Sequence, residues 1–600
     1  MKKQTLKIPM RDGTHLETDL FLPDAEARFP ALLMRHPYGR LYSDSVYESM
    51  TDDGYAVLFQ NDRGRFGSEG KWWPLHETSI RDGADSVDWI ASQPWCDGNV
   101  GLFGSSYAGV TQWHTAMAAP ESLRAMAPVV AGSIQDYFPF VSPGVWALGT
   151  LMGWTLNVAN HEADKLGLSS DNHEIRGFMD LNRKLMETTD MGSDADMEAL
   201  VKAAAQVPPA FEKLLNDHPL ADFAPSVQGF APWVDEWLAH PDPADDYWQA
   251  VDWSRRYADI DTPAFIVAGW HDLFITSAFR DFSGLNGRIA NRVKLIVHPG
   301  SHTMGLAPSG YMRVGERLFR MSAVEGPWEG LVPGNPGGLS KGLRDWFERW
   351  LKGKPDADAS APIRLYVMGA DEWRDEWEWP LARTRWTRFH LHSQGQANSL
   401  NGDGRLSTDA PVEEPPDHFE YDPTDPVPTI GGRGLLPVAA GVFDHAELEK
   451  RPDILVYSTD PLNEDVEVTG PVVLNLWVAT SAVDTDFTAR LLDVFPDGVA
   501  YNLTDGVTRL RFRPDKPGPV VPGEVEQVEI VLAPTSNLFQ RGHRIRLEVS
   551  SSNFPFADPN PNTGKCLLSD AANETIVAQQ TVFHDSQRPS HLVLPVIPAG

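Results

Sequence analysis

The sequence predicts an α/β domain that is interrupted by a helical insertion and followed by an all-β domain. From residue 1 to about 130, short apolar runs alternate with amphipathic stretches, which is typical of a mainly parallel sheet covered by helices. The segment from about 135 to 245 has helical periodicity with few β-branched runs. After residue 355, short β-rich segments alternate with Pro, Gly and Asp turns, and a β-sandwich or jelly roll fits this spacing.

In the first part, apolar runs predict buried strands, and an amphipathic stretch between two of them predicts a helix. The helix is expected at Thr78–Ser92, because Ile80, Ala84, Val87 and Ala91 recur at helical spacing. The strands are expected at Pro30–Arg35, Tyr55–Phe59 and Val100–Phe103, and the same pattern resumes at Pro263–Ala268 and Arg292–Val297. This order of elements indicates βαβ units with a segment inserted between them.

The insertion is interpreted as a cap, because three of its stretches have helical periodicity. These helices are expected at residues 144–160, 172–188 and 195–215. In the C-terminal part, the β-rich segments include Arg364–Met368, Val472–Val478 and Ile545–Ser550.

Composition limits the classes of function. The chain has 600 residues, of which 42% are hydrophobic, so two to four globular domains are expected. A formal net charge of −32 opposes binding to nucleic acid or to an anionic membrane. The two cysteines, Cys96 and Cys566, provide neither a disulfide framework nor a zinc ligand set. Since no stretch resembles a signal peptide or a membrane span, we expect a soluble, cytoplasmic protein.

The segment Gly101–Gly109 is the most informative in the chain, because it predicts a strand that turns sharply into a helix with a serine at the apex. Such a nucleophile elbow needs small residues two positions before and two after the nucleophile, since the strained turn brings them against neighbouring backbone. Ser106 has Gly104 and Ala108 there, whereas the preceding Ser105 would place two aromatic residues at these positions. Ser106 is therefore the candidate nucleophile.

A literal G-x-S-x-G match occurs elsewhere, at Gly338–Gly342. It follows a Gly/Pro-rich run and no predicted strand precedes it, so we expect the start of a helix there.

A serine nucleophile needs a base within hydrogen-bond reach and a carboxylate that orients the base. In a hydrolase sheet both follow the serine, each at the carboxyl end of a later strand. Asp272 follows the strand predicted at Pro263–Ala268, and His302 follows the next predicted strand. His271 and His298 compete with His302, but His271 adjoins the proposed acid and His298, at a strand end, is expected to be a packed or hydrogen-bonded core residue.

Several motifs together give the chain a specific resemblance. They are Arg35–Arg40, Asp62–Gly70, Gln93–Gly98, Gly104–Trp113, His240–Trp248, Gly269–Asp272, Asp460–Asp465 and Ser552–Asn560. With these motifs the chain resembles the cocaine esterase family, which belongs to the X-Pro dipeptidyl-peptidase group of α/β-hydrolases. The resemblance covers nearly the whole sequence.

The resemblance implies an α/β-hydrolase domain with an inserted helical cap, and a C-terminal jelly-roll domain that helps to wall the active site. The expected boundaries are 1–134 and 246–354 for the two parts of the hydrolase domain, 135–245 for the cap and 355–600 for the jelly roll. In relatives, the tyrosine of a Pro-Tyr motif donates its hydroxyl to the oxyanion. Here that tyrosine is Tyr38, with the backbone N–H of Tyr107 as the second donor.

The resemblance also implies residues of the acyl pocket. Phe274 and Trp154 would form an aromatic wall with Phe140 as a further candidate, and Leu435 and Leu436 would close the pocket from the third domain.

The sequence departs from the family pattern at one place. Relatives usually carry Gly-Pro-Trp before the residue that precedes the histidine, whereas this chain has His298-Pro299-Gly300. That side of the pocket is expected to be more open or differently filled.

The expected function is a serine esterase that cleaves a small-molecule carboxylic ester through an acyl-enzyme. Ser106 attacks, His302 passes the proton to the leaving alcohol and Asp272 holds the imidazole, with no metal or organic cofactor. The alternatives are an X-Pro dipeptidyl aminopeptidase and an amino-acid ester or β-lactam acyl hydrolase. Against the latter, the chain has Ala108 where the amino-acid ester hydrolases carry a glutamate. Carbohydrate binding by the β domain is the non-enzymatic alternative, and a homodimer is left open.

Overall fold

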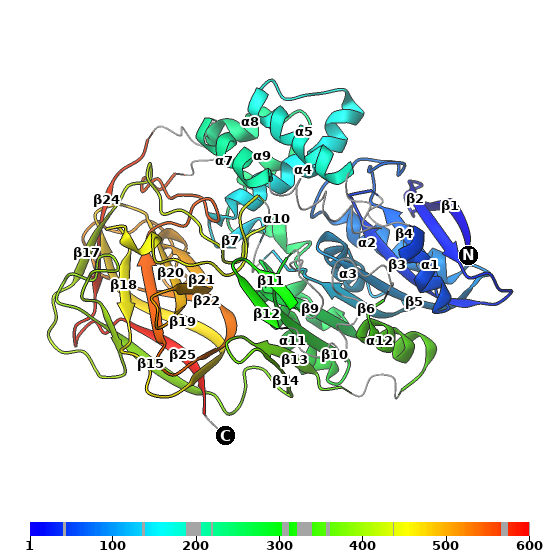
Figure 1. Cartoon of the computed structure of the whole chain (residues 1–600). Helices are drawn as coiled ribbons and strands as arrows, with labels where there is room; N and C mark the ends of the chain where they lie inside the picture. The colour runs from blue at the N-terminus through cyan, green and yellow to red at the C-terminus, as the bar shows by residue number, and fades with distance from the viewer. Residues whose placement is uncertain are drawn as a thin grey trace.

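The structure is a computed structural model of the chain. It describes residues 1–39, 44–134, 138–187, 206–217, 220–302, 311–320, 339–355, 360–435, 437–565 and 574–598. An α/β part and an all-β part lie side by side, and the helical insertion lies over their junction (Figure 1).

Ten strands of the described residues form the sheet of the α/β part. In order across the sheet they are β1 (Lys2–Pro9), β2 (His15–Leu22), β4 (Ala56–Asn61), β3 (Phe29–His36), β5 (Cys96–Ser105), β6 (Leu123–Val129), β9 (Ala264–His271), β10 (Val293–Ser301), β13 (Ile363–Val367) and β14 (Glu372–Glu376). The strands from β4 to β13 are parallel to their neighbours, whereas β1, β2 and β14 pair antiparallel at the two ends. The predicted mainly parallel sheet is confirmed.

Helices cover both faces of this sheet, which explains why its central strands are continuous apolar runs. Consecutive residues of β3 point to opposite faces: Leu33 packs in a core with Val87 and Trp113, and Leu32 in another core with Phe347. The helices are α1 (Asp44–Asp52), α2 (Thr78–Ala91), α3 (Tyr107–Met117), α11 (Ile275–Ile289) and α12 (Lys341–Lys352). The helix expected at Thr78–Ser92 is α2.

The serine of the literal G-x-S-x-G motif lies at the start of a helix, as expected. Ser340 is the N-cap of α12, and its hydroxyl accepts a hydrogen bond from the N–H of Leu343 at 3.3 Å. The Ser340 hydroxyl therefore serves as an acceptor for a backbone N–H group at the helix N-terminus, and it is not presented on a nucleophile elbow.

The insertion is mainly helical. Its elements are β7 (Phe140–Ser142), β8 (Val145–Trp146), α4 (Leu148–Leu166), α5 (His173–Glu187), α7 (Val207–Asp217), η1 (Leu220–Asp222), α8 (Phe223–Val227), α9 (Trp233–Leu238), α10 (Asp246–Gln249), η2 (Trp253–Arg255) and η3 (Tyr257–Asp259). The helix expected from residue 144 begins only at Leu148, because Val145 and Trp146 pair with β7 instead. Most of the helix expected at 195–215 lies outside the described residues, and α7 covers its end.

The C-terminal part is all β, as predicted. Its described strands are β15 (Arg385–His392), β16 (Arg405–Ser407), β17 (Asp417–Tyr421), β18 (Leu455–Ser458), β19 (Val466–Thr480), β20 (Asp486–Val494), β21 (Ala500–Arg509), β22 (Glu526–Phe539), β23 (Arg544–Ser550), β24 (Ala578–Phe583) and β25 (His591–Ile597), with short helices η4 (Leu448–Lys450) and η5 (Leu510–Phe512). They pair antiparallel except for β16 with β18. The jelly-roll order and the domain boundaries stay predictions.

The segment Arg364–Met368 was expected in the β domain, and this expectation is wrong. It forms β13, which pairs parallel with β10 in the first sheet, so that sheet continues beyond residue 355. The buried side chains of Ile363 and Leu365 extend the core from Leu295 and Val297. A separate hairpin of β11 (Tyr311–Val314) and β12 (Arg317–Arg320) precedes it.

Candidate active site

Ser106 lies at a strained turn between β5 and α3. Its φ of 58° and ψ of −125° are unfavourable for a residue with a Cβ, and such strain persists where the surrounding structure enforces it. A Cβ at Gly104 would lie 2.7 Å from the Cβ of Ala108, which explains why the position two before the serine must be glycine. The predicted nucleophile elbow is therefore present, with Ser106 at its apex.

The three residues chosen for the triad lie together. Nδ1 of His302 is 2.9 Å from Oδ1 of Asp272, and Nε2 of His302 is 3.0 Å from Oγ of Ser106. The Asp272 carboxylate accepts the Nδ1 proton, which leaves Nε2 free to accept the proton of the serine hydroxyl. The Asp272 side chain is fully buried, and that of His302 is 9% exposed. This is the geometry in which a serine hydroxyl can be activated.

Sheet topology brings these residues together from distant parts of the chain. Asp272 directly follows β9 and His302 directly follows β10, and these strands are parallel neighbours. Their carboxyl ends therefore meet at one edge of the sheet, as the chain order predicted.

The two competing histidines are core residues. Nδ1–H of His271 donates to the carbonyl oxygen of Pro299 at 3.0 Å, and Nδ1 of His298 accepts from the N–H of Gly300 at 3.0 Å. Both are fully buried, and burial lowers the pKa of each to about 4. Neither hydrogen bonds with Ser106 in the described structure, so the preference for His302 agrees with the geometry.

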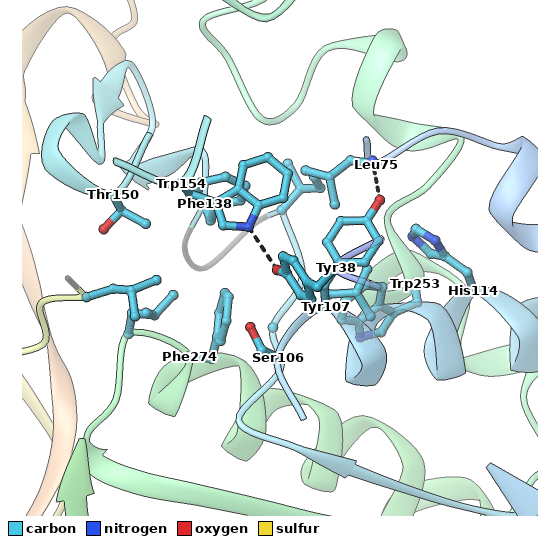
Figure 2. A pocket seen from close by; sticks show the side chains of 15 residues that line it. Tyr38, Leu75, Ser106, Tyr107, His114, Phe138, Thr150, Trp154, Trp253 and Phe274 are labelled. Carbon is cyan, nitrogen blue, oxygen red and sulfur yellow. Dashed lines mark hydrogen bonds between the residues drawn. The ribbon is translucent and has the colours of Figure 1, made fainter. Parts of the chain in front are cut away.

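Both residues expected to form the oxyanion hole lie beside Ser106. Tyr38 follows β3, and Tyr107 is the first residue of α3, where backbone N–H groups lack acceptors within the helix. Burial raises the pKa of Tyr38 to about 12, and hydrogen bonds with Trp154 and Ser106 partly offset this effect. The phenol therefore keeps its proton at neutral pH. The Tyr107 side chain points away, and its hydroxyl accepts from the N–H of Leu75 at 3.1 Å (Figure 2).

A largely apolar cavity of about 520 Å³, which includes space open to solvent, adjoins Ser106 (Figure 2). Three predicted pocket residues line it: Phe274, Trp154 and Leu435. The Phe274 ring also contacts the His302 ring edge-on at 5.6 Å. The remaining lining residues, which sequence reasoning did not identify, are Leu75, Val110, His114, Gly132, Ile134, Phe138, Thr150, Trp253 and Leu273. Of these, Val110 and His114 follow Ser106 at intervals of four residues, so they lie on the same face of α3. This spacing in the sequence could have indicated them.

Phe140 was expected in the pocket wall, but this expectation is wrong, because Phe140 does not line the cavity. It is 1% exposed and packs against Trp146 and Trp248, with ring centroids 4.5 and 5.6 Å away. Its place in the β7–β8 hairpin makes it a core residue, whereas Phe138 lies at the cavity. The other predicted residue, Leu436, lies outside the described residues.

At the departure from the family pattern, side chains lie close to Gly300. A Cβ at Gly300 would lie 2.7 Å from Nδ1 of His298 and 2.8 Å from the sulfur of Met312. These two side chains occupy the space beside Gly300, but neither is among the described residues that line the cavity, so the expectation of a more open or differently filled pocket side stays a prediction.

The described residues contain no group of three or more His, Cys, Asp or Glu side chains that could hold a metal ion. In the part of the chain that is described, no helix has the length and apolar character needed to cross a membrane.

Family models and a known relative match nearly the whole chain. The family model of the X-Pro dipeptidyl-peptidase (S15 family) matches residues 12–304, and the model of the X-Pro dipeptidyl-peptidase C-terminal non-catalytic domain matches residues 355–593. The sequence is 38% identical to the cocaine esterase of Rhodococcus sp. (strain MB1 Bresler) over 602 residues, which cover 98% of this chain and 97% of that protein.

Two solved structures resemble the whole fold. An aminopeptidase from a marine sediment archaeon, Thaumarchaeota archaeon, has a TM-score of 0.78 at 22% identity, covering 100% of this chain and 96% of its own. A selenomethionine-labelled α-amino acid ester hydrolase has a TM-score of 0.77 at 22% identity, covering 99% and 96%. At these identities the likeness shows the fold alone.

Proposed function

The chain belongs to the cocaine esterase family of the X-Pro dipeptidyl-peptidase (S15) group, and on this basis we propose that it is a serine esterase with Ser106 as its nucleophile. The observation that carries the proposal is the unbroken hydrogen-bonded chain from Ser106 through His302 to Asp272. Membership of the family identifies a serine hydrolase that acts on esters. The geometry supports the assignment of each step to a residue.

In the proposed mechanism, Oγ of Ser106 attacks the ester carbonyl carbon while its proton moves to Nε2 of His302. The former carbonyl oxygen takes the electron pair, and the Tyr38 hydroxyl and the Tyr107 N–H stabilise its charge. Collapse breaks the bond to the alcohol, which leaves with the proton from His302. Water then attacks the acyl-enzyme by the same route, releasing the carboxylic acid and restoring the serine hydroxyl.

The lining of the cavity favours an apolar, flat acyl group. Phe138, Trp154 and Phe274 present aromatic surface to it, and the described residues that line it include no Asp or Glu. An ammonium group bound there would lack a carboxylate partner among these described residues, which disfavours aminopeptidase and amino-acid ester substrates. We therefore propose esters of aryl carboxylic acids as the substrate class. We also propose a cytoplasmic location, which the scarcity of cysteine supports.

The nucleophile is tested by Ser106→Ala. We expect kcat for p-nitrophenyl esters to fall by about 10⁴- to 10⁶-fold with an unchanged circular dichroism spectrum, because the triad acts as a unit. Labelling by a fluorophosphonate probe should disappear in the same variant. Near-normal turnover or persistent labelling at another serine would remove Ser106 from the mechanism, and Ser340→Ala serves as a control that keeps full activity.

The substrate class is tested by comparing kcat/KM for p-nitrophenyl benzoate, p-nitrophenyl acetate, an amino-acid p-nitrophenyl ester and an X-Pro p-nitroanilide. We expect the benzoate to be the best substrate of the four. Preference for either substrate that carries an ammonium group would refute the proposed class while leaving the serine mechanism intact.

A further inference from the structure

The indole of Trp154 makes a directed contact with the oxyanion residue Tyr38. Its Nε1–H donates a hydrogen bond to the Tyr38 hydroxyl oxygen at 2.9 Å (Figure 2). Trp154 belongs to α4 of the insertion, whereas Tyr38 follows β3 of the α/β sheet. The contact therefore links the cap to the oxyanion hole.

Neighbouring rings hold the indole in one orientation. It stacks on the Tyr107 ring on one side, with centroids 6.0 Å apart and planes 15° apart, and on the Trp237 ring, at 6.2 Å and 16°. Phe138 packs edge-on against it at 5.1 Å. Because these contacts come from α3, α9 and the segment before β7, the indole N–H has a direction that the surrounding packing determines.

The direction of the Tyr38 proton follows from that of the indole N–H. An indole nitrogen can only donate, so the Tyr38 oxygen must accept, and its own proton must point elsewhere. Ser106 is close enough to influence the Tyr38 hydroxyl, and both residues line the same cavity. A hydroxyl that accepts one hydrogen bond also becomes a stronger donor of the next. The N–H of Trp154 thus both orients the Tyr38 proton toward the reacting centre and strengthens it as a donor.

We propose that Trp154 is a positioning residue for Tyr38: its indole N–H directs the Tyr38 hydroxyl proton toward the oxyanion. The inference rests on the proposed function and assigns to Trp154 a role in the rate, in addition to its place in the cavity wall. The raised pKa of Tyr38 agrees with this role, because a phenol that keeps its proton can serve as a donor throughout the physiological range.

A double-mutant cycle tests the proposal with p-nitrophenyl acetate, whose small acyl group makes little use of the cavity wall. Tyr38→Phe should lower kcat by about 10²- to 10³-fold, as the loss of an oxyanion donor does. Trp154→Phe should lower kcat by about 10-fold or more, with little change in KM, because it removes an interaction that acts on the transition state. In the Tyr38→Phe background, Trp154→Phe should have almost no further effect. Equal effects in both backgrounds would overturn the proposal.

A second replacement keeps the test valid if Trp154→Phe loosens the stack. Site-specific incorporation of benzothienylalanine at position 154 preserves the bicyclic ring and replaces only the N–H by sulfur. The same replacement at Trp377, which is 73% exposed, controls for incorporation. We expect the analogue at 154 to reproduce the loss in kcat, and full activity of that protein would refute the proposal.

The outcome can be separated from a failure of the proposed function. If Ser106→Ala stays active, the serine mechanism itself is wrong. If Ser106→Ala is inactive and Tyr38→Phe is fully active, the serine mechanism stands and the role of Trp154 is refuted together with that of Tyr38.

Discussion

His271, His298 and His302 lie near the carboxyl ends of two neighbouring strands, but their surroundings give them different chemistry. Burial lowers the pKa of His271 and His298 to about 4, so both are neutral at physiological pH and serve as hydrogen-bonded core residues. His302 instead contacts a carboxylate on one side and a serine hydroxyl on the other. The position relative to Ser106, and not the residue type, therefore decides which of these histidines can act as a base.

The raised pKa of Tyr38 predicts how activity depends on alkaline pH. The pKa of about 12 lies above that of a free phenol, so the folded protein favours the protonated form of Tyr38. The resulting contribution to folding stability is fully present below about pH 10, and it is lost as the pH rises toward 12. The kcat/KM ratio of the wild type to Tyr38→Phe should therefore be constant from pH 8 to about 10.5. An ordinary tyrosine would lose about three quarters of its protonated form by that pH. A fall of about fourfold in the ratio would contradict the burial of Tyr38.

Helix α4 connects all three parts of the molecule at the active site. Trp154 donates to the hydroxyl oxygen of Tyr38, and Gly149 donates its N–H to the carbonyl oxygen of Pro555 in the β domain at 2.8 Å. Gly153 lies on the same face as Gly149, one turn further on, where a Cβ would overlap with the ring of Pro437. The two glycines thus let a loop of the β domain approach the helix that carries Trp154.

This close approach predicts opposite effects for two glycine substitutions in the insertion. Gly153→Ala should lower both the melting temperature and kcat, because the added methyl group must displace Pro437 or shift α4. Gly177→Ala in α5 is the matched control, since Gly177 is exposed and a Cβ there meets no atom within 4 Å. Higher helix propensity should make that variant more stable by up to about 1 kcal/mol. A Gly153→Ala variant with a raised melting temperature and normal kcat would contradict the prediction.

At the level of the whole molecule, a buried ionic network joins the insertion to the β domain. Arg509 at the end of β21 pairs with Asp486 at 2.8 Å and with Asp558 at 3.2 Å, and it donates to the carbonyl oxygen of Gly144. Asp558 in turn accepts from the N–H of Trp146 at 2.6 Å. The β domain therefore holds the β7–β8 hairpin in place. Because this hairpin directly precedes α4, the packing of the β domain also affects the position of Trp154 on that helix.

Removal of the central cation should destabilise the protein strongly. Arg509→Met would leave two buried carboxylates without their partner, a loss of about 3 to 5 kcal/mol in typical cases. The half-exposed pair of Arg288 and Asp261, 2.9 Å apart, provides the control, and Arg288→Met should change stability by less than about 1 kcal/mol. Urea denaturation of both variants measures the difference. Equal midpoints would mean that the network contributes little to the joining of the domains.

Local features of the candidate site could be predicted from sequence because they depend on neighbouring residues. The small residues around Ser106 indicate the elbow, and the order of strands along the chain locates Asp272 and His302 at adjacent strand ends. Phe140 was misplaced because aromatic residues of the hairpin segment look alike in sequence, and only packing against Trp146 and Trp248 buries this one.

By itself, the sequence determined the α/β and all-β architecture, the turn that presents Ser106 and the two residues that form a hydrogen-bonded series with it, since periodicity and turn sterics act over a few residues. Tertiary structure alone decided that β13 joins the first sheet, that His298 and Met312 fill the space beside Gly300, and that Trp154 donates to Tyr38. The physical reason is that these contacts join segments far apart in the chain. Their free energy depends on how whole elements pack, which no local pattern specifies.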